Sequence, residues 1–178
     1  IAEEIGYKYI SCSYRVCPMI NYTSRGYTTT ADTYLNPVIK NFTNKISEFF
    51  LNSDINYMQS SGFLSNKKNF SGKTSILSGP AGGVNAGIHI AKLNNIKEVI
   101  GFDMGGTSTD VWHFAGEVEK RLETKISGIY LKSPVLNIDS IASGGGSIIN
   151  YKQKRFTVGP NSAGAYPGPA CYRNNGPL

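Results

Sequence analysis

Residues 101–111 read GFDMGGTSTDV, and this stretch decides the fold. The residues that lead into it, 98–104, form a largely apolar run that predicts a buried β-strand. Gly105 and Gly106 allow a tight turn, and residues 107–114 then predict the returning strand of a hairpin. Because Asp103 precedes the turn and Asp110 follows it, each arm of the predicted hairpin carries one carboxylate.

The residue types around this turn are those that bind a polyphosphate. Glycines let backbone N–H groups approach phosphate oxygens without a Cβ in the way, and neighbouring hydroxyl groups can donate further hydrogen bonds. A carboxylate can hold Mg²⁺ through water or orient an attacking water. A Gly-Gly turn alone would equally suit an ordinary hairpin, but that alternative does not require the acids and hydroxyls. The predicted site residues of the hairpin are Asp103, Gly105, Gly106, Thr107, Ser108, Thr109 and Asp110.

The sequence on both sides of the hairpin alternates between helix and strand patterns. Residues 28–50 place apolar side chains along one helical face, with an N-cap at 28–30 and a kink or true start at Pro37. Residues 78–93 predict a second helix, whose glycine-rich start either holds an anion or packs closely. Further strands are predicted at 5–14, 55–59, 117–125, 135–142, 147–151 and 155–158. The predicted fold class is therefore α/β.

Composition excludes several functional classes. With 178 residues, 40% hydrophobic and 17% charged, the chain resembles an ordinary globular protein. No run approaches the roughly 18 apolar residues of a membrane span. The net charge of +6 arises from short basic clusters without any nucleic-acid-binding motif, so we predict no nucleic-acid or membrane partner. Three cysteines without a CxxC pair predict reduced thiols and a cytosolic location, and the start at Ile1 predicts a piece of a longer protein.

Four motifs in this order resemble the hydantoinase A/5-oxoprolinase family, and within it the ATP-dependent 5-oxoprolinase branch matches best. They are LSGPAGG at 77–83, GFDMGGTSTDV at 101–111, DSIASGGGS at 139–147 and VGPNSAGAYPGPACY at 158–172. The branch is also marked by Arg25-Gly26-Tyr27, by Ala115-Gly116-Glu117 and by the closing CYRNNGPL at 171–178. The resemblance covers nearly the whole chain and is specific because the motifs agree in order and spacing.

The resemblance implies part of an actin-like ATPase fold (the sugar kinase, Hsp70 and actin superfamily), incomplete at both ends. Residues 1–96 would be the C-terminal part of the first lobe with connecting helices. Residues 97–178 would begin the second lobe, which opens with the phosphate hairpin, and the first lobe's own hairpin would lie upstream of Ile1. Gly144, Gly145 and Gly146 would approach the nucleotide, although three glycines alone equally suit a flexible turn.

The implied reaction is ATP-dependent opening of 5-oxo-L-proline to L-glutamate, within glutathione turnover. ATP would phosphorylate the amide oxygen and so make the lactam hydrolysable by water. The implied cofactors are ATP and Mg²⁺, the metal held by Asp103 through water. The implied partners are a hydantoinase B-like region, in the same chain or as a separate subunit, and a second copy in a homodimer of the full-length protein. Residues 1–178 alone are expected to be inactive.

One departure from the family leaves other functions open. The family's acidic M-x-S-D-G-G-L segment reads MQSSGFL here, with Ser61 in place of the acid and Phe63 in place of the second glycine. If that acid serves lactam opening, this copy is impaired. The alternatives are therefore a hydantoin-cleaving or ketone-carboxylating relative, and a decayed, non-catalytic fragment.

Overall fold

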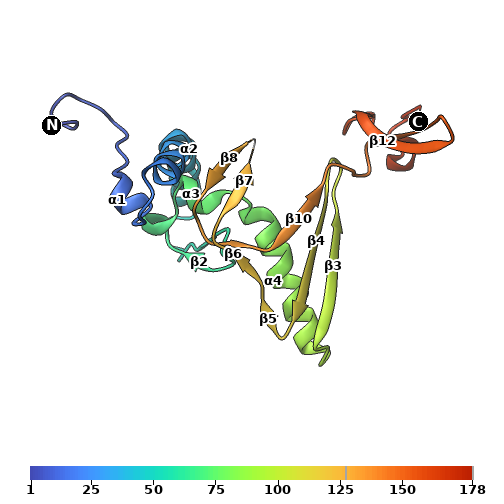
Figure 1. Cartoon of the computed structure of the whole chain (residues 1–178), viewed down its shortest axis with the longest axis horizontal. Helices are drawn as coiled ribbons and strands as arrows, with labels where there is room; N and C mark the ends of the chain where they lie inside the picture. Colours follow the sequence, from blue (N-terminus) through green and yellow to red (C-terminus); the bar gives the residue numbers. More distant parts are fainter. Residues whose placement is uncertain (127, 178) are drawn as a thin grey trace. The chain divides into compact units, whose positions relative to one another are not determined.

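The computed structural model describes residues 1–126 and 128–177, which form two compact units of mixed α/β structure (Figure 1). Unit 1 contains residues 1–90 and 117–137, and unit 2 contains residues 91–116 and those from 138 onward. These units differ from the two contiguous segments predicted at 1–96 and 97–178, because residues 117–137 return to the first unit. The assignment of the segments to lobes of an ATPase stays a prediction. Leu178, the end of CYRNNGPL, lies outside the described residues.

Unit 1 is built on α2 (Tyr22–Phe49), the long blue helix of Figure 1. The helix begins before the predicted start because Asn21, not residues 28–30, caps it: the Asn21 side chain accepts a 3.2 Å hydrogen bond from the Ser24 N–H. Pro37 lies inside the helix and neither begins nor ends it. The predicted helix is therefore confirmed, with a different first turn.

The buried side of α2 is polar, which contradicts the predicted apolar core face. Val38, Phe42 and Phe49 are 66%, 50% and 81% exposed, whereas Thr28 and Asp32 are buried. The reason lies in the neighbours of the helix. Asp32 accepts the backbone N–H of Lys73 at 2.9 Å, and the Asn36 amide donates to Asp32 at 2.8 Å. The α3 segment therefore docks on α2 partly through a hydrogen bond to a buried carboxylate.

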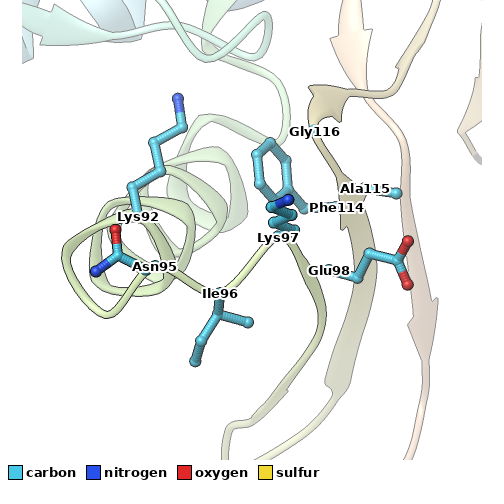
Figure 2. A pocket seen from close by; sticks show the side chains of 8 residues that line it. All are labelled: Lys92, Asn95, Ile96, Lys97, Glu98, Phe114, Ala115 and Gly116. Carbon is cyan, nitrogen blue, oxygen red and sulfur yellow. The ribbon is translucent and has the colours of Figure 1, made fainter.

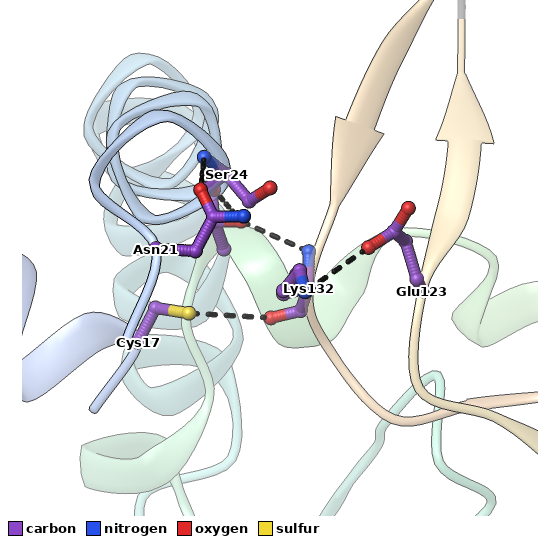
Figure 3. Close-up of polar contacts among 6 residues, drawn as sticks. Cys17, Asn21, Ser24, Glu123 and Lys132 are labelled. Atoms are coloured by element: carbon purple, nitrogen blue, oxygen red, sulfur yellow. Dashed lines mark hydrogen bonds and ion pairs between the residues drawn. The ribbon is translucent and has the colours of Figure 1, made fainter. Parts of the chain in front are cut away.

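Residues 117–126 and 128–137 form short antiparallel ribbons in place of the single strand predicted at 117–125. Lys132 anchors them on the N-terminal part of unit 1, as Figure 3 shows. Its N–H donates to the Thr28 hydroxyl at 2.9 Å, and its carbonyl accepts the Cys17 thiol at 3.9 Å. Its ammonium lies 3.3 Å from the Glu123 carboxylate. The strands are β5 (Glu117–Val118), β6 (Lys120–Arg121), β7 (Thr124–Ile126), β8 (Ile129–Leu131) and β9 (Val135–Leu136).

The remaining elements of unit 1 surround this arrangement. They are α1 (Ser13–Val16), β1 (Tyr57–Met58), β2 (Leu64–Ser65), η1 (Lys67–Asn69), α3 (Gly72–Ser75) and α4 (Ser78–Leu93), whose last residues belong to unit 2. The strand predicted at 5–14 is wrong: these residues form turns and the start of α1, because no neighbouring strand pairs with them in the described chain. None of the described helices has the length and apolarity to cross a membrane.

Unit 2 contains the hairpin, and its strands β3 (Glu98–Met104) and β4 (Thr109–Ala115) confirm that prediction. A third antiparallel strand, β10 (Ile138–Ile141), pairs with the other edge of β4. The predicted burial of β3 is wrong for this chain, since Ile100 and Phe102 are 72% and 66% exposed. A second antiparallel pair, β11 (Ser147–Lys152) with β12 (Arg155–Ser162), is followed by the short helix η2 (Ala170–Tyr172).

Candidate functional site

The turn of the hairpin is short and closed by one backbone hydrogen bond. Met104 and Thr109 form the last residue pair of the β3–β4 ladder. Beyond them, the Gly105 N–H donates to the Ser108 carbonyl at 2.9 Å. Gly106 and Thr107 therefore form the tip of the hairpin.

The glycine run of residues 144–146 lies along this tip. The N–H of Gly145 donates to the Gly105 carbonyl at 2.9 Å, and the N–H of Gly146 donates to the Gly106 carbonyl at 2.8 Å. The Thr109 hydroxyl adds a 2.6 Å hydrogen bond to the Ser143 carbonyl. Two predicted site segments, more than thirty residues apart in the sequence, are thus joined backbone to backbone.

This contact explains why the glycine run is made of glycine. A Cβ at Gly144 would lie 2.5 Å from the Thr107 nitrogen and 2.6 Å from the Gly105 carbonyl oxygen, closer than non-bonded atoms approach. The close approach at Gly144 is therefore to the hairpin backbone. The predicted contact of the run with a nucleotide stays a prediction.

Packing does not explain the glycines of the hairpin in the same way. Neither Gly105 nor Gly106 has a positive φ. A Cβ would make only ordinary contacts, 3.5 Å from the Ser108 carbonyl oxygen at Gly105 and 3.7 Å from the Tyr172 hydroxyl at Gly106. Since neither backbone conformation nor protein packing requires glycine here, the open space beside the backbone is available to a ligand.

The tip also presents unused donors. The carbonyls of Gly105 and Gly106 accept hydrogen bonds from the glycine run, so the tip is one-sided: these acceptors are occupied, and its donors remain. Within residues 1–126 and 128–177, the N–H groups of Gly106, Thr107 and Ser108 have no hydrogen-bond partner. The side-chain hydroxyls of Thr107 and Ser108 have none there either. Successive free N–H groups at a turn form an anion-binding concavity. Thr107 also lines a cavity of about 610 Å³, together with Ala142, Ser147, Val158, Gly159, Pro160 and Ser162.

The two predicted catalytic acids are brought together. Asp103 and Asp110 are directly opposite each other on neighbouring strands, and Ser140 of β10 is opposite Asp110 on its other side. Residues opposite each other in a ladder point to the same face of the sheet. In the described part of the chain neither carboxylate has a hydrogen-bond or ion-pair partner. No group of three or more His, Cys, Asp or Glu side chains gathers among the described residues.

Sequence reasoning missed two residues that contact the glycine segments at the tip. The Ser162 hydroxyl donates to the Gly146 carbonyl at 3.0 Å. The Tyr172 hydroxyl lies 2.6 Å from the position of a Cβ at Gly145. Both belong to the VGPNSAGAYPGPACY motif, so the motif was visible, but its contact with the hairpin depends on tertiary structure.

Two other features of the sequence belong to unit 1. At the start of α4, a Cβ at Gly79 or Gly82 would meet nothing within 4 Å, so close packing does not account for these glycines. The anion-binding alternative for that helix start stays a prediction. In MQSSGFL, the Ser61 hydroxyl lies 3.5 Å from the Gln59 amide oxygen, and the Phe63 ring lies 4.1 Å from the Lys120 ammonium.

A second cavity in unit 2, of about 510 Å³, lies at the open end of the hairpin, far along β3 and β4 from the tip (Figure 2). Lys92 and Asn95 line it from the end of α4, and Phe114 lines it from β4. The Lys92 ammonium lies 5.7 Å from the centre of the Phe114 ring. None of the predicted site residues contributes to this cavity.

Residues 25–178 match the family model described as hydantoinase/oxoprolinase. The chain belongs to this family. Among curated family members, the 5-oxoprolinase of Saccharomyces cerevisiae is 49% identical over 184 residues, which cover 100% of this chain and 14% of that protein. The caprolactamase subunit alpha of Pseudomonas jessenii is 31% identical over 176 residues, which cover 94% of this chain and 25% of that protein.

Two solved structures of hydantoinase/oxoprolinase relatives share the fold. Nucleotide-free acetone carboxylase matches with a TM-score of 0.75 and 28% identity. The match covers 92% of this chain and 24% of the acetone carboxylase chain. The ATP-dependent caprolactamase of Pseudomonas jessenii matches with a TM-score of 0.74 and 31% identity. The match covers 93% of this chain and 25% of the caprolactamase chain. The chain thus spans about a seventh to a quarter of the relatives it matches.

Proposed function

We propose that this chain supplies the phosphate-binding hairpin of an ATP-dependent cyclic amide hydrolase, which opens 5-oxo-L-proline to L-glutamate in glutathione turnover. The observation that carries the proposal is the one-sided tip. The carbonyls of Gly105 and Gly106 are held by Gly145 and Gly146, while the N–H groups of residues 106–108 remain available to an anion. Identity of 49% to a 5-oxoprolinase supports the choice of substrate.

The chemistry needs such a tip because a lactam is a poor electrophile. Transfer of the terminal phosphoryl group of ATP to the lactam oxygen converts that oxygen into a leaving group. Water then adds to the ring carbon, the C–N bond breaks and the nitrogen takes up a proton, which leaves an acyl phosphate. A second water hydrolyses the acyl phosphate to the carboxylate and inorganic phosphate. Backbone donors that are fixed before the reaction stabilise the charge that develops on the transferred phosphoryl oxygens.

Asp103 and Asp110 suit the second requirement, a hard cation beside the phosphates. Mg²⁺ prefers oxygen ligands, keeps several waters and is bound by one or two carboxylates together with phosphate oxygens. Two opposed carboxylates next to the tip, which have no partner among residues 1–126 and 128–177, match this description. When bound, the ion would neutralise phosphate charge. Asp110 or Asp103 would hold and orient its water shell.

The larger assembly is inferred from the family. We propose that residues 1–96 and 97–178 belong to the first and second lobes of an actin-like ATPase. A hydantoinase B-like region would complete the enzyme, and the similarity to a caprolactamase subunit named alpha supports a partner subunit. We further propose that the full-length protein forms a homodimer in the cytosol.

Two other functions share the hairpin. A hydantoin-cleaving or ketone-carboxylating enzyme is supported by the TM-score of 0.75 to acetone carboxylase, which is close to the 0.74 for caprolactamase. A decayed, non-catalytic copy is supported by Ser61 and Phe63 in MQSSGFL.

Activity assays on the full-length protein separate these functions. We expect ATP hydrolysis to depend on 5-oxo-L-proline and not on hydantoin, caprolactam or acetone with bicarbonate. Turnover with another of these substrates alone would reassign the enzyme. ATP binding without turnover on any of them would favour the decayed copy. Normal turnover by a Gly106→Val protein would show that the hairpin is not part of the active site.

A further inference from the structure

Tyr172 lies across the glycine segments at the hairpin tip. Its ring passes Gly168, where a Cβ would lie 2.6 Å from the ring atom Cδ2. Its hydroxyl reaches Gly145 and Gly106, 2.6 Å and 3.7 Å from the positions of their Cβ atoms. The helix η2 fixes this position through the Tyr172 N–H, which donates to the Pro169 carbonyl at 2.9 Å.

The hydroxyl of Tyr172 has no hydrogen-bond partner in the part of the chain that the structure describes. At Gly168 the packing uses a ring atom, which phenylalanine would supply as well, whereas at Gly145 and Gly106 the nearest atom of Tyr172 is the hydroxyl oxygen. A phenol that loses water needs a partner, because an unsatisfied polar group in a closed site is costly. Tyr172 as a residue is 38% exposed.

We propose that the Tyr172 hydroxyl binds the nucleotide directly, by donating a hydrogen bond to a phosphate oxygen held at the hairpin tip. The donors of Gly106, Thr107 and Ser108 and the hydroxyl of Tyr172 then surround one anion, with three donors from the backbone and one from a side chain. This inference rests on the proposed function and adds a binding residue contributed by the loop that follows β12.

The proximity of Tyr172 also accounts for two glycines. Any side chain at Gly145 would meet the phenol, and any side chain at Gly168 would meet the ring. These positions therefore keep the ring in place and leave its hydroxyl directed at the tip. Tyr172 is a ligand-contacting residue in this arrangement, and Gly168 is a positioning residue for it.

The test is Tyr172→Phe in the full-length protein, because it removes one oxygen and keeps the ring. Tyr166→Phe is the matched control: it makes the same chemical change in the same loop, at a residue that is 84% exposed. Titration with ATP and with ADP gives dissociation constants without turnover. Thermal unfolding reports any structural damage.

We expect Tyr172→Phe to weaken binding of ATP about tenfold or more, as for a hydrogen bond to a charged group, with an unchanged melting temperature. Weaker ATP binding with normal ADP binding would assign the hydroxyl to the terminal phosphate. Weaker binding of both would assign it to an inner phosphate. Dissociation constants equal to those of wild type and Tyr166→Phe would overturn the inference.

Asp103→Asn and Gly106→Val, measured in parallel, separate this failure from failure of the proposed function. If both variants lose ATP hydrolysis while Tyr172→Phe binds ATP normally, only the role of Tyr172 is lost. If all three variants behave like wild type, the hairpin is not the phosphate site.

Discussion

Asp103 and Asp110 face each other across the β3–β4 ladder, one residue pair before the turn. Two like charges directly opposite each other destabilise a sheet. The hairpin therefore carries an arrangement that folding alone does not favour. A bound cation would remove the repulsion.

The first prediction concerns these carboxylates. Asp103→Asn keeps the shape of the side chain and removes one of two repelling charges, so the full-length protein should stay folded with a near-normal melting temperature. ATP hydrolysis should fall about a hundredfold or more, the scale of losing an acid–base or water-orienting group. Retention of more than half of the wild-type kcat would make the carboxylate structural. Asp110→Asn should have the same effect.

A second prediction contrasts two glycines that meet at the tip. Gly144→Ala places a methyl group against the hairpin backbone, which cannot move aside as a flexible side chain would. It should reduce the free energy of unfolding by about 1–3 kcal/mol or more. Gly106→Ala makes only a 3.7 Å contact, so it should leave stability unchanged and weaken ATP binding. Chemical denaturation and nucleotide titration of both variants measure this split, and equal losses of stability would contradict it.

A third prediction tests packing away from the tip. A Cβ at Gly101 would lie 1.8 Å from the Cε2 atom of Trp112, so the indole ring lies directly over this glycine. Gly101→Ala should displace the ring and destabilise the protein by about 1–3 kcal/mol. Trp112 is the only tryptophan of the chain, so fluorescence of residues 1–178 reports the displacement. Gly79→Ala, which meets nothing within 4 Å inside α4, should instead be neutral or stabilising.

A fourth prediction tests the attachment of residues 117–137. The Thr28 hydroxyl donates to the Ser24 carbonyl at 2.8 Å and accepts the Lys132 N–H at 2.9 Å. Thr28→Val keeps the volume but leaves the Lys132 N–H unpaired, which should cost about 1–3 kcal/mol of unfolding free energy. Thr29→Val is the control, because among the described residues the Thr29 hydroxyl bonds only the Arg25 carbonyl of its own helix. A loss of stability as large for Thr29→Val would show that the helical bond alone matters.

A fifth prediction concerns residues 1–178 on their own. Together they span 14% of the yeast 5-oxoprolinase, and the described residues contain one acid–Gly-Gly-Thr hairpin. We expect no ATP hydrolysis that depends on 5-oxo-L-proline from this chain in isolation. Measurable turnover in a coupled assay for ADP would establish a much smaller catalytic unit.

The sequence predicted best where local chemistry decides structure. The apolar run of residues 98–104 and the two glycines placed both arms of the hairpin, with one carboxylate on each arm. The structure adds that Asp103 and Asp110 are directly opposite each other. It failed on α2, where Val38, Phe42 and Phe49 of the apolar face are exposed. Thr28 and Asp32 are buried instead, because the segments that dock there bring backbone donors. Hydrophobic periodicity indicates which residues avoid water, but it does not indicate which segments of the chain pack against the helix.

The support of the tip lay beyond prediction for the same reason. Gly144 looks like any turn glycine until the hairpin backbone is placed against it, and Tyr172 carries no local pattern at all. Long-range contacts between backbone atoms leave no periodic trace in a sequence. The candidate acids and glycines could therefore be named in advance, but not their division into ligand-facing and packing residues.

Because residues 117–137 return to unit 1, the chain should respond in a particular way to proteolysis and to the exchange of segments between homologous enzymes. The chain passes between the units three times, after residues 90, 116 and 137. A single protease cut at any crossing cannot release one unit. Residues 1–90 stay bound to residues 117–137 through Lys132 and Ser60, and residues from 138 onward stay bound to β4 through β10. A graft of one unit onto a homologous enzyme must likewise replace two separate stretches together. Recombination at a single point between 90 and 137 would join segments that never evolved to fit.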